Sequence, residues 1–357
     1  MRRRAGLVPT ALALVVTAAG CGHARVAGPT LRPRWRWSAP SPASVGMPAA
    51  DAVGVAATYG HRALVLLDGA GNLRWQVEHV GVRDVAPRFV GPLVLVATDD
   101  GLAAFGRGDG HRLWEASLGD RASTPTVVGG RPVVTLWGGA LVAVDLLDGH
   151  QAWRQPLPGP ALGPPAGDAG VVVATWETEG GHGGMVAVDA DGRVQWSVSL
   201  PGGGVGGPAA AAGVAVAVAG DSQAHGVDVT TGRERWHAAT GGAGSPEVPP
   251  LVVGPDVLVA DRLGGLTTLR AATGATTGHV ESDGVDIRGG PAGPGPGGWY
   301  ALPLDEGRLQ LVRGRQRRVV PSGSGGRIAG VAVGPRRVLV VAGREAVGNG
   351  LDAWAGW

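Results

Sequence analysis

The amino-acid sequence predicts an all-β protein built from a repeated unit, and two observations carry this prediction. First, the apolar residues occur in short Val-, Ala- and Leu-rich runs such as PLVLVAT and DVLVA, each bounded by Gly, Pro or Asp. Runs of this length between turn-forming residues are typical of short buried strands. Second, a glycine followed four positions later by a tryptophan recurs at a nearly constant interval along the chain. No long helical periodicity competes with this pattern.

The Gly-x-x-x-Trp step occurs five times. Its tryptophans are separated by 39, 39, 43 and 40 residues, an interval that indicates a repeat architecture. The glycines are Gly71, Gly110, Gly149, Gly192 and Gly232, and the tryptophans are Trp75, Trp114, Trp153, Trp196 and Trp236. One interval upstream lies Trp37. One interval downstream, Gly274 keeps the glycine while Gly278 stands in place of the tryptophan.

Each unit has the same internal order, which residues 122–159 illustrate. Strands are expected near Pro125–Val128, Pro132–Trp137 and Ala140–Asp145, then a turn at Leu147–Gly149 and a fourth strand through Trp153. Four short antiparallel strands in about 40 residues are typical of one propeller blade. The repeat glycine would supply a positive φ at the last turn, and the tryptophan would cover the junction with the next blade.

Counting the two degenerate units near Gly278 and Arg318 gives eight positions. The element that carries Trp37 has no strands before it, and the last residues supply about three strands. Joining them would complete a blade and remove an exposed sheet edge. The sequence thus predicts an eight-bladed β-propeller of four-stranded antiparallel blades, closed by N- and C-terminal strands in one shared blade.

The first residues have a different character. An Arg-rich start, an apolar stretch over Leu7–Val16 and small residues before Cys21 form the layout of a secretory signal peptide. The segment AAGC resembles the lipobox of bacterial lipoproteins, although Ala18 stands where Leu or Val is usual. We expect a lipoprotein signal peptide over residues 1–20, a lipidated flexible tether over 21–32 with Cys21 as the lipidation site, and the propeller domain over 33–357. The alternative is an ordinary signal peptide with Cys21 incidental.

Charge and cysteine content narrow the function. Cys21 is the one cysteine, so no disulfide can form within the chain. The formal net charge is +2, and it falls to −1 when Arg2, Arg3 and Arg4 leave with the signal peptide. A domain with this balance lacks the basic excess that nucleic-acid binding requires. No nucleic-acid partner is expected.

The repeat also resembles a known family. The segments VAVDLLDGHQAW, VAVDADGRVQW and HGVDVTTGRERW resemble the consensus Ala-hydrophobic-Asp-x-x-Thr/Asp-Gly-x-x-x-Trp. This is similar to the pyrroloquinoline-quinone-like (PQQ-like) β-propeller repeat, and the lipoprotein character resembles the propeller subunit of the outer-membrane β-barrel assembly machinery. The resemblance implies the fold; it implies function only loosely, because propellers host many activities.

That family also contains quinone-dependent dehydrogenases, many of which hold their cofactor with adjacent cysteines and a metal ion. Neither feature maps onto this chain, so no cofactor, metal or catalytic residue is predicted. Asp145, Asp189 and Asp228 recur at one blade position and are interpreted as turn hydrogen bonders. Glu177, Glu179 and His182 could in principle meet a metal; the favoured interpretation is a polar hairpin between two strands. His111 and His150 are interpreted as polar turn residues.

These observations predict a non-catalytic extracytoplasmic lipoprotein, a monomeric propeller that acts as a scaffold for protein–protein interaction at the cell envelope. The expected partners are the membrane, through the lipid anchor, and an envelope protein of unknown identity. The location would be the outer face of the cell membrane, or the periplasm or outer membrane in a host with two membranes. A small-ligand-binding propeller and a quinone-dependent oxidoreductase are the alternatives.

Overall fold

A computed structural model describes most of the chain after its first 31 residues. The described residues are 32–40, 44–82, 85–241, 248–261, 264–281, 292, 298–304, 307–313, 316–321, 327–333, 339–344 and 350–355. The predicted signal peptide and the tether, with Cys21, lie outside them except for Arg32. Among the described residues, no helix is long and apolar enough to cross a membrane.

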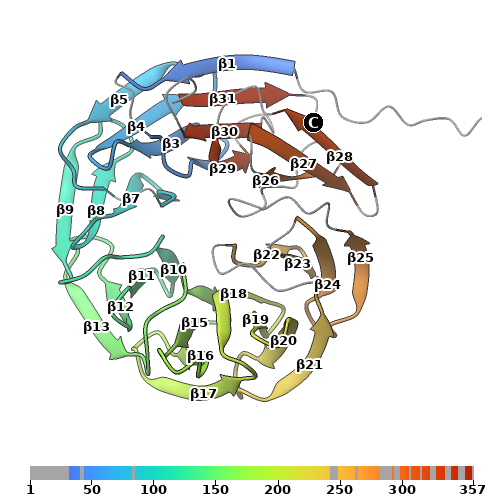
Figure 1. The fold of residues 1–357 in the computed structure, drawn as a ribbon. Coiled ribbons are helices and arrows are strands. Elements are labelled where there is room, and N and C mark those ends of the chain that lie inside the picture. The colour runs from blue at the N-terminus through green and yellow to red at the C-terminus, as the bar shows by residue number, and fades with distance from the viewer. Residues whose placement is uncertain are drawn as a thin grey trace, which may run out of the picture.

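All elements of the described chain are β-strands, arranged in antiparallel sheets around a central axis (Figure 1). The first strands are β1 (Arg32–Ser38), β2 (Ala49–Ala50), β3 (Gly54–Tyr59), β4 (Ala63–Asp68), β5 (Leu73–Val77), β6 (Arg88–Val90), β7 (Leu93–Ala97), β8 (Gly101–Gly106), β9 (Arg112–Ser117), β10 (Thr126–Val128), β11 (Arg131–Leu136), β12 (Ala140–Val144), β13 (Gln151–Pro156), β14 (Ala166–Asp168), β15 (Val171–Glu177) and β16 (Gly183–Val188). They are followed by β17 (Val194–Leu200), β18 (Gly204–Ala211), β19 (Val214–Ala219), β20 (Gln223–Asp228), β21 (Glu234–Ala239), β22 (Leu251–Val253), β23 (Asp256–Ala260), β24 (Leu266–Arg270), β25 (Thr276–Val280), β26 (Tyr300–Leu304), β27 (Arg308–Arg313), β28 (Gln316–Pro321), β29 (Arg327–Val333), β30 (Leu339–Arg344) and β31 (Gly350–Ala355).

The strands form seven four-stranded blades and one three-stranded sheet. Six blades are continuous in sequence: β2–β5, β6–β9, β10–β13, β14–β17, β18–β21 and β22–β25. The seventh has the order β1-β31-β30-β29, and the three-stranded sheet has the order β26-β27-β28. The all-β propeller with four-stranded antiparallel blades is confirmed, but the prediction of eight such blades is wrong, because the described chain completes seven.

Among the described residues, the three-stranded sheet has no inner strand like the one with which the continuous blades begin. Beside β26, Ala292 and Ala301 form an isolated bridge of two backbone hydrogen bonds, each 2.9 Å long.

Within a blade, the strands lie where the sequence predicts them. In residues 122–159 the predicted strands correspond to β10, β11, β12 and β13; the ends of the first three differ from the predicted ends by at most one residue, and β13 contains Trp153. The register is irregular next to each repeat tryptophan. In the blade β10–β13, for example, Ala143 pairs with Trp153, and the ladder then shifts between Ala143 and Val144. The extra residue re-aims the outer strand as it leaves the turn.

The hydrophobic core is divided among the junctions between consecutive sheets. The described residues form eight apolar clusters, and each combines side chains of two neighbouring sheets. One cluster joins Leu95 and Trp114 of the blade β6–β9 to Leu136 and Val142 of the blade β10–β13. Because the middle strands of a blade are buried on both faces, strands such as β7, β12 and β19 read as continuous apolar runs, whereas outer strands such as β9 alternate.

The ends of the chain close the ring, as the sequence predicts. β1 pairs antiparallel with β31, so that the N-terminal strand becomes the outer strand of the blade β29–β31 (Figure 1). The guanidinium of Arg36 donates to both carboxylate oxygens of Asp352, at 2.5 and 2.9 Å. Asp352 is buried, and its carboxylate is compensated by this fork-shaped contact. Because of this closure, β1 covers the hydrogen-bonding edge of β31, which would otherwise be exposed.

Candidate interaction site

The predicted repeat residues meet in pairs across blade junctions. The indole of Trp75, on β5, lies against Gly110 in the β8–β9 turn of the next blade, and its Nε1 donates to the carbonyl oxygen of Arg107 at 2.9 Å. A Cβ added at Gly110 would lie 2.8 Å from Trp75 Cδ2, and the glycine has a φ of 75°. Two constraints therefore require glycine at this position: the positive φ of the backbone, and the absence of room for a Cβ against the Trp75 ring.

The same contact repeats around the ring. The further donor–acceptor pairs are Trp114 Nε1 to Leu146 O at 3.0 Å, Trp153 to Ala190 at 2.9 Å, Trp196 to Val229 at 2.8 Å and Trp236 to Ala271 at 2.9 Å. The glycines beneath these four rings are Gly149, Gly192, Gly232 and Gly274, all with positive φ. Each tryptophan thus fastens one blade to the following one, which is a structural role.

At the N-terminus the contact is made by Trp35 and not by the predicted Trp37. The Nε1 of Trp35 donates to Gly69 O at 3.3 Å, and its ring lies over Gly71. Trp37 instead packs edge-on against Tyr59, with 5.8 Å between ring centroids. Both tryptophans share one face of β1, so alternation alone does not separate them. The register shift between Pro33 and Trp35 places Trp35 beside the irregularity, as in the other outer strands.

The recurring aspartates cap the turns that carry the glycines. Oδ1 of Asp145 accepts from the backbone N–H of Leu147 at 2.8 Å, and Oδ1 of Asp189 accepts from Asp191 and Arg193, both at 2.9 Å. Asp228 accepts from the Thr230 hydroxyl at 2.7 Å and forms a salt bridge with Arg235. These contacts hold the pKa of Asp228 well below its usual range. Turn capping is the predicted role of these residues.

The repeated strand order gives the ring two distinct faces. The turns with the repeat glycines, between the third and outer strands, lie on one face, which we call the turn face. The hairpins between the second and third strands and the links between blades lie on the opposite face, the funnel face. In the blade β10–β13, for example, the N–H of Trp137 in the hairpin donates to Arg121 O in the link at 3.0 Å.

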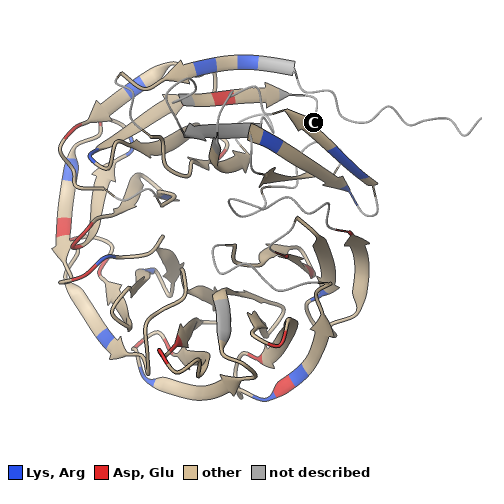
Figure 2. Cartoon of the chain, viewed as in Figure 1, with Lys and Arg blue, Asp and Glu red and all other residues tan. Residues whose placement is uncertain are grey.

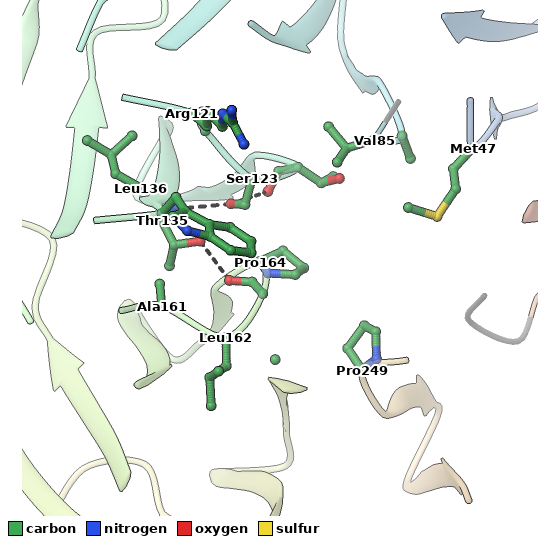
Figure 3. A pocket seen from close by; sticks show the side chains of 16 residues that line it. Met47, Val85, Arg121, Ser123, Thr135, Leu136, Ala161, Leu162, Pro164 and Pro249 are labelled. Atoms are coloured by element: carbon green, nitrogen blue, oxygen red, sulfur yellow. Dashed lines mark hydrogen bonds between the residues drawn. The ribbon is translucent and has the colours of Figure 1, made fainter. Parts of the chain in front are cut away.

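A cavity of about 650 Å³ opens at the axis on the funnel face (Figure 3). Its lining comes from the links and inner strands of six consecutive blades, represented by Met47, Val85, Ala122, Leu162, Gly207 and Pro249. Most of the side chains that line it are apolar. Its volume lies within the range of pockets that enclose a small ligand or a few side chains.

The polar groups in this cavity are largely engaged by the backbone. The Thr135 hydroxyl donates to Gly163 O at 2.6 Å, and the Ser123 Oγ accepts from the Thr135 N–H at 3.1 Å (Figure 3). The exposed Arg121 guanidinium forms no salt bridge with the described residues. Beside it, at the end of β11, the Trp137 side chain is 65% exposed. The cavity therefore offers an apolar interior with an exposed aromatic residue and one cation near its mouth.

The other polar residues that the sequence singles out lie in hairpins and turns. Glu177 ends β15, and Glu179 and His182 lie in the β15–β16 hairpin, which confirms the predicted polar hairpin. Among the described residues, no group of three His, Cys, Asp or Glu side chains could hold a metal ion. His111 and His150 are exposed on the turn face. The predicted lipidation site at Cys21 lies outside the described residues.

The axial cavity was not found from the sequence. Its lining residues come from links such as ASTP and ALGPP, which have no shared motif and are spread over more than 200 residues. The one available signal was topological, since the first strand of every propeller blade faces the axis. A sequence pattern locates the repeat but not the width of the space that the repeats leave at their centre.

A closed ring of antiparallel blades with a cavity at its axis defines a β-propeller. Comparison with family models gives three overlapping matches, over residues 22–162, 98–182 and 160–285, to the family described as outer membrane protein assembly factor BamB. The matches cover more than half of the chain. The chain belongs to this family.

Solved structures share the fold at low sequence identity. The crystal structure of BamB from Moraxella catarrhalis has a TM-score of 0.67 and 17% identity, over 91% of this chain and 99% of that one. The computationally designed Ika8 protein has a TM-score of 0.72 and 14% identity, over 89% and 98%. The C-terminal WD40 domain of Sif2 has a TM-score of 0.69 and 10% identity, over 91% of this chain and 98% of that one. A search of curated protein sequences found no match.

Proposed function

We propose that this protein is a non-catalytic scaffold for protein–protein interaction at the cell envelope, held to the membrane through a lipid on Cys21. The observation that carries the proposal is the family match over residues 22–285, to a family described as an assembly factor. The rigid ring supports it, because loops on a rigid frame are the usual carriers of binding function. The proposal does not require an outer membrane, and its partner is an envelope protein.

The N-terminal sequence supports the anchored location. Residues 1–20 have the layout of a lipoprotein signal peptide, and Cys21 stands where lipidation would occur. Residues 21–32 would then tether the ring to the membrane surface. A diacylated cysteine binds a bilayer much more firmly than a single acyl chain does.

In-cell crosslinking followed by mass spectrometry tests the scaffold, with a Cys21→Ala variant as the unanchored control. We expect the wild-type protein to capture a specific envelope protein, and the Cys21→Ala variant to lose both membrane fractionation and this capture. Membrane fractionation that survives in the variant would contradict the anchor. Absence of any specific crosslinked protein in the wild type would contradict the scaffold.

The axial cavity favours one second candidate, a propeller that binds a small ligand. Its volume of about 650 Å³ suits such a ligand, and its apolar lining would favour an apolar one. Native mass spectrometry of the protein purified from its host distinguishes the two functions. A stoichiometric small molecule that is retained in the cavity, with no crosslinked protein, would favour the second candidate.

A further inference from the structure

Acidic side chains lie on both faces of the ring. On the turn face, Asp51 pairs with Arg107 at 2.5 Å, Asp256 with Arg270 at 3.2 Å, and Asp228 with Arg235, while other carboxylates accept hydrogen bonds from the backbone of their own turns. On the funnel face of the four consecutive blades β6–β21, six carboxylates form no salt bridge with an arginine among the described residues. We call these six the acidic rim: Asp99, Asp100, Asp120, Glu177, Glu179 and Asp221.

The residues of the acidic rim are connected through backbone hydrogen bonds to the links at the mouth of the axial cavity. Its residues lie in or beside the hairpins of four consecutive blades, and a backbone hydrogen bond ties each hairpin to a link. The N–H of Asp99 donates to Gly81 O at 3.1 Å, and the N–H of Glu177 donates to Pro160 O at 3.0 Å. The residue after Pro160, Ala161, lines the cavity. Charge and apolar surface are therefore parts of one site.

Other charged groups near this face do not neutralise the rim. Glu78 belongs to a separate cluster, in which its carboxylate accepts from the Tyr59 hydroxyl at 2.5 Å and lies 3.9 Å from the Arg62 guanidinium. The Asp120 carboxylate accepts from the backbone N–H groups of Arg121 and Gly138. Arg121 and Arg154, whose guanidinium donates to Leu118 O at 3.0 Å beside Asp120, supply two positive charges against six negative ones. Many of the other arginines lie on outer strands such as β1, β13 and β28 (Figure 2).

The geometry points to an extended polypeptide segment as the occupant, one in which Lys or Arg residues flank apolar side chains. The apolar side chains would enter the axial cavity, and the flanking cations would meet the acidic rim. Because the rim carboxylates stand on three hairpins and one link of four consecutive blades, a ligand must carry several separated cations to contact them together. Nucleic acids and anionic membranes are disfavoured by repulsion of their phosphates. This inference rests on the proposed scaffold function and names the chemistry of the partner.

The test uses the full-length protein in detergent and three fluorescein-labelled peptides. GRRALFARRG combines basic flanks with an apolar centre, GEEALFAEEG reverses the charge, and GRRGSGGRRG removes the apolar centre. In fluorescence anisotropy, we expect GRRALFARRG to bind at least tenfold more tightly than either control peptide. Its affinity should fall as salt rises, since exposed charge pairs are screened. Equal affinity for GEEALFAEEG would overturn the inference.

Variants assign the binding to the site. The rim variant Asp99→Asn, Asp100→Asn, Glu179→Gln should weaken GRRALFARRG about tenfold, the combined effect of three exposed charges. A turn-face variant with the same change in charge, Asp109→Asn, Asp148→Asn, Asp191→Asn, should stay within about twofold of wild type. An equal loss of affinity in both variants would show that the net charge of the protein, and not the acidic rim, determines binding. That result would overturn the assignment of the site.

The cavity is tested by Leu162→Gln, which keeps the size of the side chain and makes it polar. We expect this variant to weaken GRRALFARRG and to leave GRRGSGGRRG unchanged, with a thermal midpoint near that of wild type. If GRRALFARRG binds unchanged, the apolar part of the inference is wrong.

The two proposals fail separately. If the rim variant still captures the crosslinked partner, the scaffold function is supported, and the partner does not bind at the funnel face. Binding of GRRALFARRG without any crosslinked envelope protein would support the site and contradict the scaffold.

Discussion

At the scale of single residues, the repeat glycines show how one position can be constrained by its backbone and its neighbour together. Gly110 has a φ of 75°, and a Cβ at this position would lie 2.8 Å from the Trp75 ring. Gly108, two residues earlier in the same turn, faces open space and has no positive φ. The two glycines form a matched pair in which only one is required.

We expect Gly110→Ala to lower the free energy of unfolding by roughly 2–4 kcal/mol, from a left-handed backbone and an overpacked ring. Gly108→Ala should stay within about 0.5 kcal/mol of wild type or be slightly stabilising. Chemical denaturation of both variants measures the difference. Equal losses would show that the turn, and not the tryptophan contact, sets the requirement.

The turn-capping aspartates make the free energy of unfolding depend on pH in the acidic range. The Thr230 hydroxyl and Arg235 lower the pKa of Asp228 in the folded protein. A folded-state pKa below the unfolded one stabilises the protein above the unfolded value and is lost as pH falls through the folded value. The unfolded value is about 3.9.

The wild type should therefore be more stable than Asp228→Asn by a constant margin at neutral pH. The margin should shrink as pH falls below about 4, where the unfolded aspartate becomes protonated. Urea denaturation at several pH values measures both proteins. A margin that grows in acid would contradict the direction of the pKa shift.

At the scale of elements, the outer strand of each blade carries a residue that belongs structurally to the next blade. Trp114, on β9, is 8% exposed and bonds to a carbonyl in the β12–β13 turn. Trp137 follows directly after β11, at the start of the β11–β12 hairpin, and is 65% exposed. The two residues are both tryptophans and differ in burial. A comparison of their substitutions therefore separates the effect of the junction contact from the effect of losing a tryptophan.

We expect Trp114→Ala to cost about 3–5 kcal/mol in the free energy of unfolding, because it leaves a cavity at a blade junction. Trp137→Ala should change that free energy by no more than about 0.5 kcal/mol. Denaturant titrations of both variants test this. A loss below about 1 kcal/mol for Trp114→Ala would contradict the fastening role of the repeat tryptophan.

At the scale of the whole molecule, the ring is held by contacts between consecutive sheets and by one closure. Each apolar cluster joins two sheets, so the stability of the ring is close to a sum of neighbour terms. The closure differs, because β1 and β31 come from opposite ends of the chain. Removing β1 would expose the hydrogen-bonding edge of β31 together with the buried Leu351.

A chain that begins at Arg32 should therefore remain monomeric, whereas one that begins at Ala39 should self-associate or aggregate through the exposed edge. Size-exclusion chromatography with light scattering measures the molecular mass of each. A monomeric, folded protein beginning at Ala39 would show that the closure is dispensable. Self-association of the chain beginning at Arg32 would instead place the cause outside β1.

The sequence by itself determined the strand class, the repeat and the closure of the ring, because these depend on local patterns. Apolar runs between turn residues specify strands, and the Gly-x-x-x-Trp step specifies the turn and outer strand within each unit of about 40 residues. The turn aspartates were predicted on the same basis. Each of these signals is contained within a single unit.

Only the tertiary structure decided features that depend on several units at once. Among the described residues, seven blades have four strands and one sheet has three, with the Ala292–Ala301 bridge beside β26. Trp35 rather than Trp37 contacts Gly71, because a register shift that alternation does not encode lies beside it. The axial cavity and its acidic rim arise from links of six blades and hairpins of three. Distances across a ring follow from how its repeats pack, and no stretch of sequence contains them.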